Sequence, residues 1–281
     1  MRAHLVVALA LLGAGSLEAQ KPLPEPAIED NSFLIEEAYN QERGIVQHIS
    51  TVTLTGPGRK DAAVGFTQEW PLRGQRHQVS YTLLYQIQQG DAPDGFGDLL
   101  LNYRQQLQDS DVWAFAPRLS LILPTGSERK GLGAGTLGGQ VNLPVSVRIG
   151  PVLAAHLNAG TQVLARVRDS AAAGGPTHRT LTTYTLGASL IGPVTRPVNL
   201  MLEFVQAWTG TLQPAGGVTH EATSTLSPGI RFALNVGGTQ IVPGVGIPIT
   251  FTEEDHTTDV LLYLSVEHPF RHDVGQQSGP D

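Results

Sequence analysis

The chain has 281 residues, a formal net charge of -7, and no cysteine. The lack of cysteine excludes a disulfide framework, thiolate metal sites and a lipoprotein anchor, and the weakly acidic balance argues against a nucleic-acid partner. Charged residues make up only 15% of the chain, against about 25% in soluble domains. No apolar run after the N-terminus is long enough for a transmembrane helix, and this combination is typical of a membrane β-barrel.

Residues 1–19 have the pattern of a secretory signal peptide. A weakly basic start with Arg2 precedes an apolar core and a small-residue cleavage site, which we place after Ala19. The alternative is a buried N-terminal helix. The signal reading predicts export from the cytoplasm.

Residues 20–44 are predicted to form a periplasmic N-terminal segment. Asp30 to Ser32 offer helix N-cap chemistry, so we expect a short helix over residues 33–41. Two placements stay open: the helix lies loosely in the periplasm, or it docks in the mouth of the barrel as a plug. The plug candidates are Phe33, Glu36, Glu37 and Tyr39.

Residues 45–270 contain about twelve runs in which apolar and polar residues alternate, the period of a β-strand. The clearest places Leu200, Leu202 and Phe204 on one face and Asn199 and Glu203 on the other. The runs cover approximately residues 45–54, 62–71, 75–88, 96–107, 112–123, 136–149, 152–167, 178–191, 197–209, 221–234, 239–251 and 256–268. Most are long enough to cross a bilayer. Residues 271–281 read as a polar C-terminal tail.

The gaps between these runs alternate in length, from short gaps such as GP to long ones such as PTGSERKGLGAG. Bacterial outer-membrane barrels have an even number of strands, short periplasmic turns and longer external loops, whereas a sandwich with Greek-key connections lacks this regularity. The fold prediction is therefore an all-β, transmembrane, antiparallel up-and-down barrel of about twelve strands. Prolines 117, 144, 228 and 243 lie inside predicted strands, where we expect bulges or local kinks.

Polar and charged residues recur opposite the apolar stripe, where they would face the lumen. These lumen-lining candidates are Glu69, Arg104, Arg118, Arg148, His156, Arg166, Glu203, Arg231 and Glu267. They either fill a closed lumen with salt bridges or line a path for solutes. If the segment docks, we expect Glu36 or Glu37 to pair with one of the arginines at positions 104, 118, 148 and 166.

The chain offers little catalytic or metal-binding chemistry. Its nine histidines are scattered without metal-ligand spacing, and we expect neither a metal nor a cofactor. The single cluster worth testing for hydrolysis is His220 and Glu221 with Ser224, and the alternative is the polar start of a strand. We therefore do not expect an enzyme.

Three stretches in the middle of the chain resemble a known family. GFGDLLLNYRQQL at 95–107, RLSLILPTG at 118–126 and GGQVNLPVSVRIG at 138–150 look like the outer-membrane proteins named for the meta-pathway of phenol degradation. These are more distantly similar to the outer-membrane channels for fatty acids and aromatic hydrocarbons. The resemblance implies a porin-like barrel in the outer membrane of a Gram-negative cell, taking up small hydrophobic compounds, and carries over no catalytic residue.

The sequence thus predicts passive uptake of small molecules, including hydrophobic or aromatic ones, across the outer membrane. One alternative is a closed structural or adhesive barrel that acts through external loops near 124–135 and 210–220. The other is an outer-membrane lipid hydrolase. The expected partners are outer-membrane lipids, the barrel insertion machinery and a small-molecule solute, and no nucleic acid is expected. The sequence makes no prediction of the oligomeric state.

Overall fold

The computed structural model describes residues 31–270 except 57, 59–60, 91–92, 173–174 and 196. The predicted signal peptide, residues 20–30 and the predicted C-terminal tail lie outside the described residues. Within the described residues, no helix is long and apolar enough to span a membrane.

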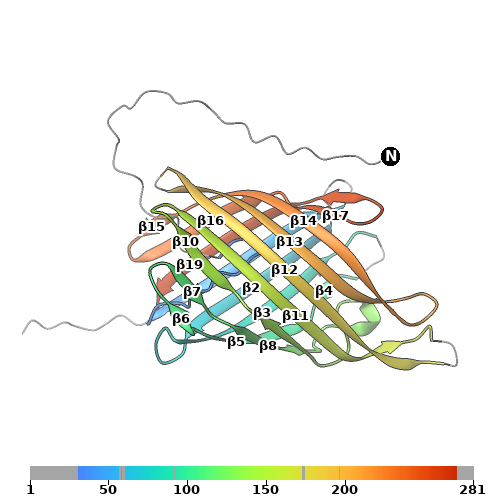
Figure 1. Ribbon diagram of the computed structural model, residues 1–281. Coiled ribbons are helices and arrows are strands. Elements are labelled where there is room, and N and C mark those ends of the chain that lie inside the picture. The colour runs from blue at the N-terminus through green and yellow to red at the C-terminus, as the bar shows by residue number, and fades with distance from the viewer. Residues whose placement is uncertain are drawn as a thin grey trace, which may run out of the picture.

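The described chain forms one antiparallel sheet that closes into a barrel of twelve spans (Figure 1). Six spans are single strands: β1 (Ile45–Thr55), β2 (Asp61–Pro71), β3 (His77–Ile87), β11 (Leu153–Asp169), β12 (Thr177–Thr195) and β13 (Val198–Leu212). Three others are interrupted: β4 (Gly95–Phe96) with β5 (Leu99–Gln105) and β6 (Gln108–Asp109), β7 (Trp113–Phe115) with β8 (Arg118–Leu123), and β9 (Gly138–Asn142) with β10 (Val145–Ile149). The last three are β14 (Val218–Phe232) with β15 (Leu234–Val236), β16 (Thr239–Gly246) with β17 (Ile249–Phe251), and β18 (His256–Thr258) with β19 (Val260–Pro269).

The barrel closes between its first and last spans. β1 pairs with β19 from Ile45↔Pro269 to Leu54↔Val260, and with β2 along its other edge. Every span pairs with its sequence neighbours, so the prediction of a twelve-stranded up-and-down barrel is confirmed.

The two ends of the barrel differ in their connections. The chain enters and leaves at one end, where the backbone N–H of Phe270 donates to the carbonyl of Gly44. The turns at this end are brief, as at residues 150–152 and 237–238, and we call it the short-turn end. Longer connections, such as residues 124–137 with the 3-10 turn η1 (Glu128–Lys130), lie at the opposite, long-loop end.

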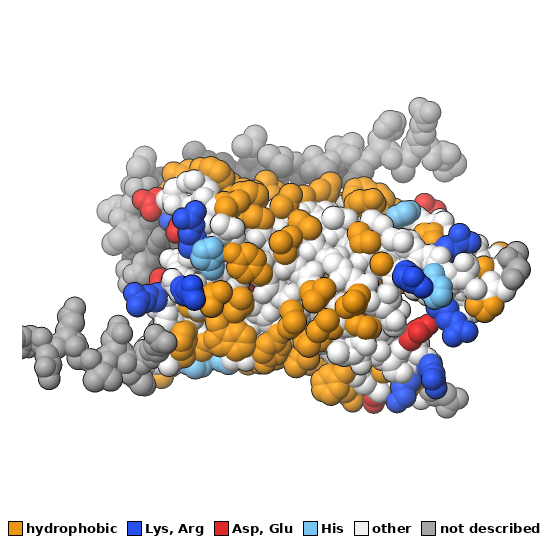
Figure 2. Space-filling model, turned by 90° about the horizontal axis from the view of Figure 1, so that it is seen from below, with side chains coloured by type: hydrophobic (Ala, Val, Ile, Leu, Met, Phe, Trp, Pro, Cys, Tyr) orange, Lys and Arg blue, Asp and Glu red, His pale blue; other side chains and the backbone are white. Residues whose placement is uncertain are grey.

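Apolar side chains cover the outside of the barrel and alternate with inward polar ones. Leu200 and Leu202 are 52% and 49% exposed, whereas Met201 and Glu203 between and beside them are 4% and 0% exposed. Figure 2 shows the hydrophobic side chains spread over the middle of the barrel wall, with Lys, Arg and His gathered toward its two ends. An apolar outer band with charged ends is the surface that a bilayer requires.

The expected bulges are absent at three of the four prolines. The register is the same on both sides of Pro144, with Arg118↔Asn142 and Phe115↔Val145, and it runs unchanged through Pro228 and Pro243. A proline removes one donor without adding a residue, so it need not shift the register. At Pro117 the register shifts by one residue on the edge toward β5 and β6, from Arg104↔Arg118 to Gln108↔Phe115, which is the expected irregularity. Register shifts also occur at Leu164/Val167 and Pro193/Thr195.

The expected helix over residues 33–41 is also wrong. These residues form bends and irregular backbone, and they lie inside the barrel against the inward faces of the strands. The reason lies in how their backbone groups are bonded.

Candidate functional site: the N-terminal segment inside the barrel

Six backbone N–H groups between residues 34 and 41 donate to side chains of the barrel wall. The pairs are Leu34 and Ile35 to Glu203 Oε1 (2.7 and 3.2 Å), Glu36 to Asn158 Oδ1 (3.0 Å), Ala38 to Ser146 Oγ (2.7 Å), Asn40 to Gln106 Oε1 (2.8 Å) and Gln41 to Gln78 Oε1 (2.8 Å). In a helix these donors would bond carbonyls four residues back. The wall replaces the helix as the hydrogen-bond partner.

Wall side chains also donate to the carbonyls of the segment. Arg104 donates to the carbonyls of Glu37 (3.1 Å) and Tyr39 (2.6 Å) and to Asn40 Oδ1 (2.8 Å). Gln106 Nε2 donates to the carbonyl of Ala38 at 2.6 Å. The buried backbone of the segment is therefore satisfied from both sides, as buried peptide groups must be.

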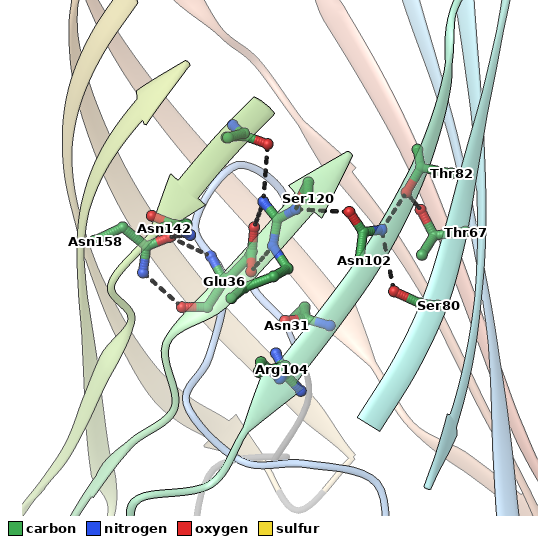
Figure 3. A network of polar contacts seen from close by, with 12 residues as sticks. Asn31, Glu36, Thr67, Ser80, Thr82, Asn102, Arg104, Ser120, Asn142 and Asn158 are labelled. Atoms are coloured by element: carbon green, nitrogen blue, oxygen red, sulfur yellow. Dashed lines mark hydrogen bonds and ion pairs between the residues drawn. The ribbon is translucent and has the colours of Figure 1, made fainter. Parts of the chain in front are cut away.

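Asn158 and Gln106 each act as both donor and acceptor toward the segment. Asn158 accepts from the N–H of Glu36 and donates to the carbonyl of the same residue at 2.8 Å. In Figure 3, Asn158 and Asn142 lie on one side of Glu36 and Asn102 lies on the other. The segment is thus held by side chains of the wall, among them amides, a hydroxyl, the Glu203 carboxylate and the Arg104 guanidinium, with no ladder to a strand among the described residues.

One ion pair joins the segment to the wall in a forked geometry. Arg118 Nη2 lies 2.5 Å from Glu36 Oε1, and Nε lies 2.9 Å from Oε2. Arg118 Nη1 also donates to Asn102 Oδ1 at 2.9 Å. Paired N–H donors on a carboxylate make this the most directional type of ion pair.

The charge of Arg118 controls the ionisation of Glu36. Burial inside the barrel alone would raise the pKa of the Glu36 carboxyl. The charge and hydrogen bonds of Arg118, with the nearby charge of Arg104, outweigh burial and hold this pKa below its ordinary value of 4.5. The carboxylate is therefore the form that binds the wall.

The other three arginines considered as partners make different contacts. Arg104 bonds backbone and amide groups of the segment, and Arg148 lies over the Tyr39 ring, 5.5 Å from its centroid, while donating to the carbonyl of Asp111. Arg166 is exposed, at the register shift of β11 and with a φ of 61°. The structure therefore does not bring Arg166 to the segment.

The remaining lumen-lining candidates lie on the inward face near the short-turn end. Arg231 Nη1 donates to the carbonyl of Asn31 at 2.6 Å, and His156 Nδ1 lies 2.7 Å from Ser146 Oγ. Gln78 Nε2 donates to Glu69 Oε2 at 2.7 Å, and Gln41 Nε2 reaches Glu267 at 3.4 Å. All four touch the segment or a residue that binds it.

Sequence reasoning missed the neutral residues that hold the segment. Four of the six N–H groups that bind the wall donate to neutral side chains, those of Gln78, Gln106, Ser146 and Asn158. The available signal was the phase of the strands: Asn102, Arg104 and Gln106 alternate on one face of a single run. A choice of the inward charged residues alone omits amides on the same face, such as Asn102 and Gln106 beside Arg104.

The segment separates two hollows within the barrel. One of about 270 Å³ is lined by Phe33, Leu34 and Glu36 with wall residues such as Thr51 and Thr82, which lie toward the long-loop end. The other, of about 550 Å³, is lined by Tyr39 to Glu42 and by residues of the short-turn end such as Asp111 and Gly238.

The cluster considered for hydrolysis does not assemble in the structure. Ser224 Oγ donates to Gln206 Oε1 at 2.5 Å, Glu221 accepts from Thr211, and His220 stacks on Tyr184. Among the described residues, no group of three or more His, Asp or Glu is placed to hold a metal ion.

No protein-family model and no curated protein sequence matches the chain. Solved structures do match. An outer-membrane channel from Pseudomonas putida F1 is similar with a TM-score of 0.59 and 14% identity, over 83% of this chain and 98% of that one. The NanC porin is similar with a TM-score of 0.52 and 6% identity, over 81% of this chain and 100% of that one.

At these identities the likeness shows the fold. The chain has the fold of the outer-membrane β-barrel channels. The family named for phenol degradation is not confirmed by these comparisons, and its substrate class stays an expectation.

Proposed function

We propose that this protein is a passive outer-membrane channel whose lumen is closed at rest by residues 31–44. The single observation that carries the proposal is the bonding of this segment: six of its backbone N–H groups and several of its carbonyls bind side chains of the wall. The candidates Phe33, Glu36, Glu37 and Tyr39 all belong to the segment.

The type of contact supports a releasable gate over a permanent filling. Individual hydrogen bonds contribute a net of about 0.5–1.5 kcal/mol because water replaces them on release. Polar wall residues such as Gln78 and Asn158 would be hydrated once the segment leaves. A hollow already lies on each side of the segment, so its displacement would join two spaces into one path.

The orientation follows from the connections. Outer-membrane barrels keep short turns in the periplasm, so we assign the short-turn end, with residues 44 and 270, to that side. The segment would then enter the lumen from the periplasm. The apolar band contacts outer-membrane lipids, and the barrel insertion machinery would place the chain there after export.

The solute is expected to be small and weakly polar. Hydrophobic or aromatic compounds are the class suggested by the resemblance of residues 95–150 to the family named for phenol degradation, which is itself distantly similar to hydrocarbon channels. The inward face toward the long-loop end is rich in neutral hydroxyls, including Thr67 and Thr82, which bond each other at 2.9 Å, and Thr225 and Thr250. Such a surface imposes little charge selection on an entering molecule.

The test is single-channel conductance of the purified protein in planar bilayers, with and without residues 20–43. This deletion keeps Gly44, whose carbonyl accepts from Phe270 and ties the two chain ends together. Deletion of residues 271–281 is the matched control at the other terminus. We expect discrete conductance that rises only after the N-terminal deletion.

Unchanged conductance after the N-terminal deletion would overturn the gate. The absence of conductance in all forms would favour a closed structural barrel acting through its loops. That alternative has one observation behind it: Asp98 accepts from the N–H groups of Gly126 and Ala134, and Leu132 is buried, so the long loop is tightly folded.

A further inference from the structure

The ring of Phe33 lies in a socket whose floor is bare backbone. A Cβ atom on Gly244 would lie 2.4 Å from Phe33 Cζ, one on Gly229 would lie 2.7 Å from Cε2, and one on Gly246 would lie 3.0 Å from Cδ2. Gly229 and Gly246 face each other across β14 and β16. Any side chain at these three positions would occupy the space that the ring fills.

The sides of the socket are apolar and include a second aromatic ring. The Tyr263 ring lies 5.0 Å from the Phe33 ring, tilted by 38°. Met201 and Leu261 are buried in the same cluster. Tilted aromatic pairs at this separation are favourable beyond the area that they bury.

The socket is set in a polar surrounding and borders an existing hollow. Glu203, Arg231 and Ser189 lie on the inward face nearby and bind residues 31–35. The hollow of about 270 Å³ on the long-loop side is lined by Phe33, Leu34, Ile49, Leu100 and Tyr263 among others. A molecule entering from the long-loop end therefore meets the Phe33 and Tyr263 side chains at the bottom of this hollow.

We propose that the socket formed by Gly229, Gly244, Gly246, Met201 and Tyr263 is a binding site for an uncharged solute with one aromatic ring, which takes the place of the Phe33 ring. The inference rests on the proposed function and deepens it. The socket matches one flat ring because Phe33 fills it, and an apolar lining disfavours a charged group. Apolar cavities of the order of 150 Å³ in other proteins take up benzene.

Competition for one socket makes the solute an opener of the channel. The ring of the solute and the ring of Phe33 cannot both bind, so solute binding favours the state in which the segment has left the wall. A ligand shifts such an equilibrium only through its different affinity for the two states. Here the solute binds only the released state, because in the docked state the Phe33 ring fills the socket.

The first arm of the test measures binding of 4-fluorobenzyl alcohol to the full chain by 19F NMR. We expect one saturable site in F33A, at least tenfold weaker binding in the wild type, and loss of the site in F33A/G244V. The control F33A/G139A alters a glycine whose added Cβ meets nothing closer than 3.8 Å, and should bind as F33A does. Thermal unfolding of each variant checks that the barrel is intact.

The second arm measures the open fraction of single channels. The fluorinated alcohol should raise the open fraction of the wild type and leave that of F33A unchanged, since Phe33 no longer competes. Cyclohexylmethanol, which has a thicker ring, controls for effects on the bilayer.

The inference is overturned if F33A shows no saturable site, if F33A/G244V binds as well as F33A, or if both alcohols open the wild type and F33A equally. Failure of the proposed channel is read separately, as the absence of conductance after deletion of residues 20–43. A conducting deletion variant alongside an F33A protein that binds no ring would remove the socket proposal and leave the channel standing.

Discussion

At the scale of single residues, the contact between Glu36 and Arg118 is a forked ion pair between the segment and the wall. Hydrogen bonds to charged groups contribute about 1.5–3 kcal/mol, and the 30% exposure of the Glu36 side chain places this pair at the lower end. Glu36 and Arg118 are 82 residues apart in the sequence, and the closed barrel brings them together.

Replacing Glu36 by Gln should weaken docking of the segment and raise the open fraction of the channel. A loss of about 1–2 kcal/mol corresponds to a factor of roughly 5–30. Single-channel recording measures this change. Glu128→Gln, which removes an exposed acid on the loop of η1, is the control, and an equal open fraction in E36Q and wild type would contradict a role for the pair.

Acid should open the channel through the same carboxylate. The pKa of Glu36 is lower in the docked segment than in the released one, so its contribution to docking is full above the ordinary value of 4.5. That contribution is lost as the pH falls through the lowered pKa. We therefore expect the open fraction to rise as the pH falls below 4.5.

The comparison with E36Q isolates this carboxylate from the other buried acids, such as Glu69 and Glu203, which both forms keep. The acid-dependent rise should be smaller in E36Q than in the wild type. An identical acid response in the two proteins would assign the effect to another group.

At the scale of elements, Asp98 organises the longest loop. Its two oxygens accept from the N–H groups of Gly126 (3.0 Å) and Ala134 (2.9 Å), which brings both ends of the loop together. Asp98→Ala should therefore expose the loop to trypsin at Arg129 and Lys130, because an open loop is cut much faster than a folded one. Timed proteolysis of the purified barrel measures the rate, with Glu253→Ala in another loop as control, and an unchanged rate would show that Asp98 does not hold the loop.

The strands could be predicted from the sequence because their determinants are local. Leu200, Leu202 and Phe204 reveal one face regardless of their neighbours, and the observed β13 begins and ends within three residues of the expected run 197–209. The helix over residues 33–41 was wrong because capping residues and spacing describe an isolated segment. Its actual conformation depends on acceptors such as Asn158 and Gln106, which come from strands far along the chain.

The partner of Glu36 shows the same limit. Four arginines shared the inward phase, and only the register of the closed sheet distinguishes Arg118 from the exposed Arg166 at a shifted ladder. The socket of Phe33 could not be predicted from the sequence either. Gly229, Gly244 and Gly246 form one surface only because β14 and β16 pair in the folded sheet.

At the scale of the whole molecule, the alternation of side chains places one face of each strand against lipid and the other face toward the lumen. Leu202 in β13 points outward beside Leu190 of β12, within the apolar band, and Ala207 of the same strand points inward opposite Thr185. A charge that faces lipid must be moved out of water, whereas a charge that faces the lumen keeps its hydration.

Leu202→Arg should therefore lower the free energy of unfolding of the lipid-embedded barrel, by up to roughly 2–4 kcal/mol if the site lies near the midplane of the bilayer. Ala207→Arg, the same charge on the same strand, should change stability far less and alter ion selectivity instead. Reversible denaturant unfolding in lipid vesicles measures the first quantity, and reversal potentials across a salt gradient measure the second. Equal stability losses at the two positions would mean that both faces of β13 are buried in protein or both face water, and a transmembrane barrel permits neither arrangement.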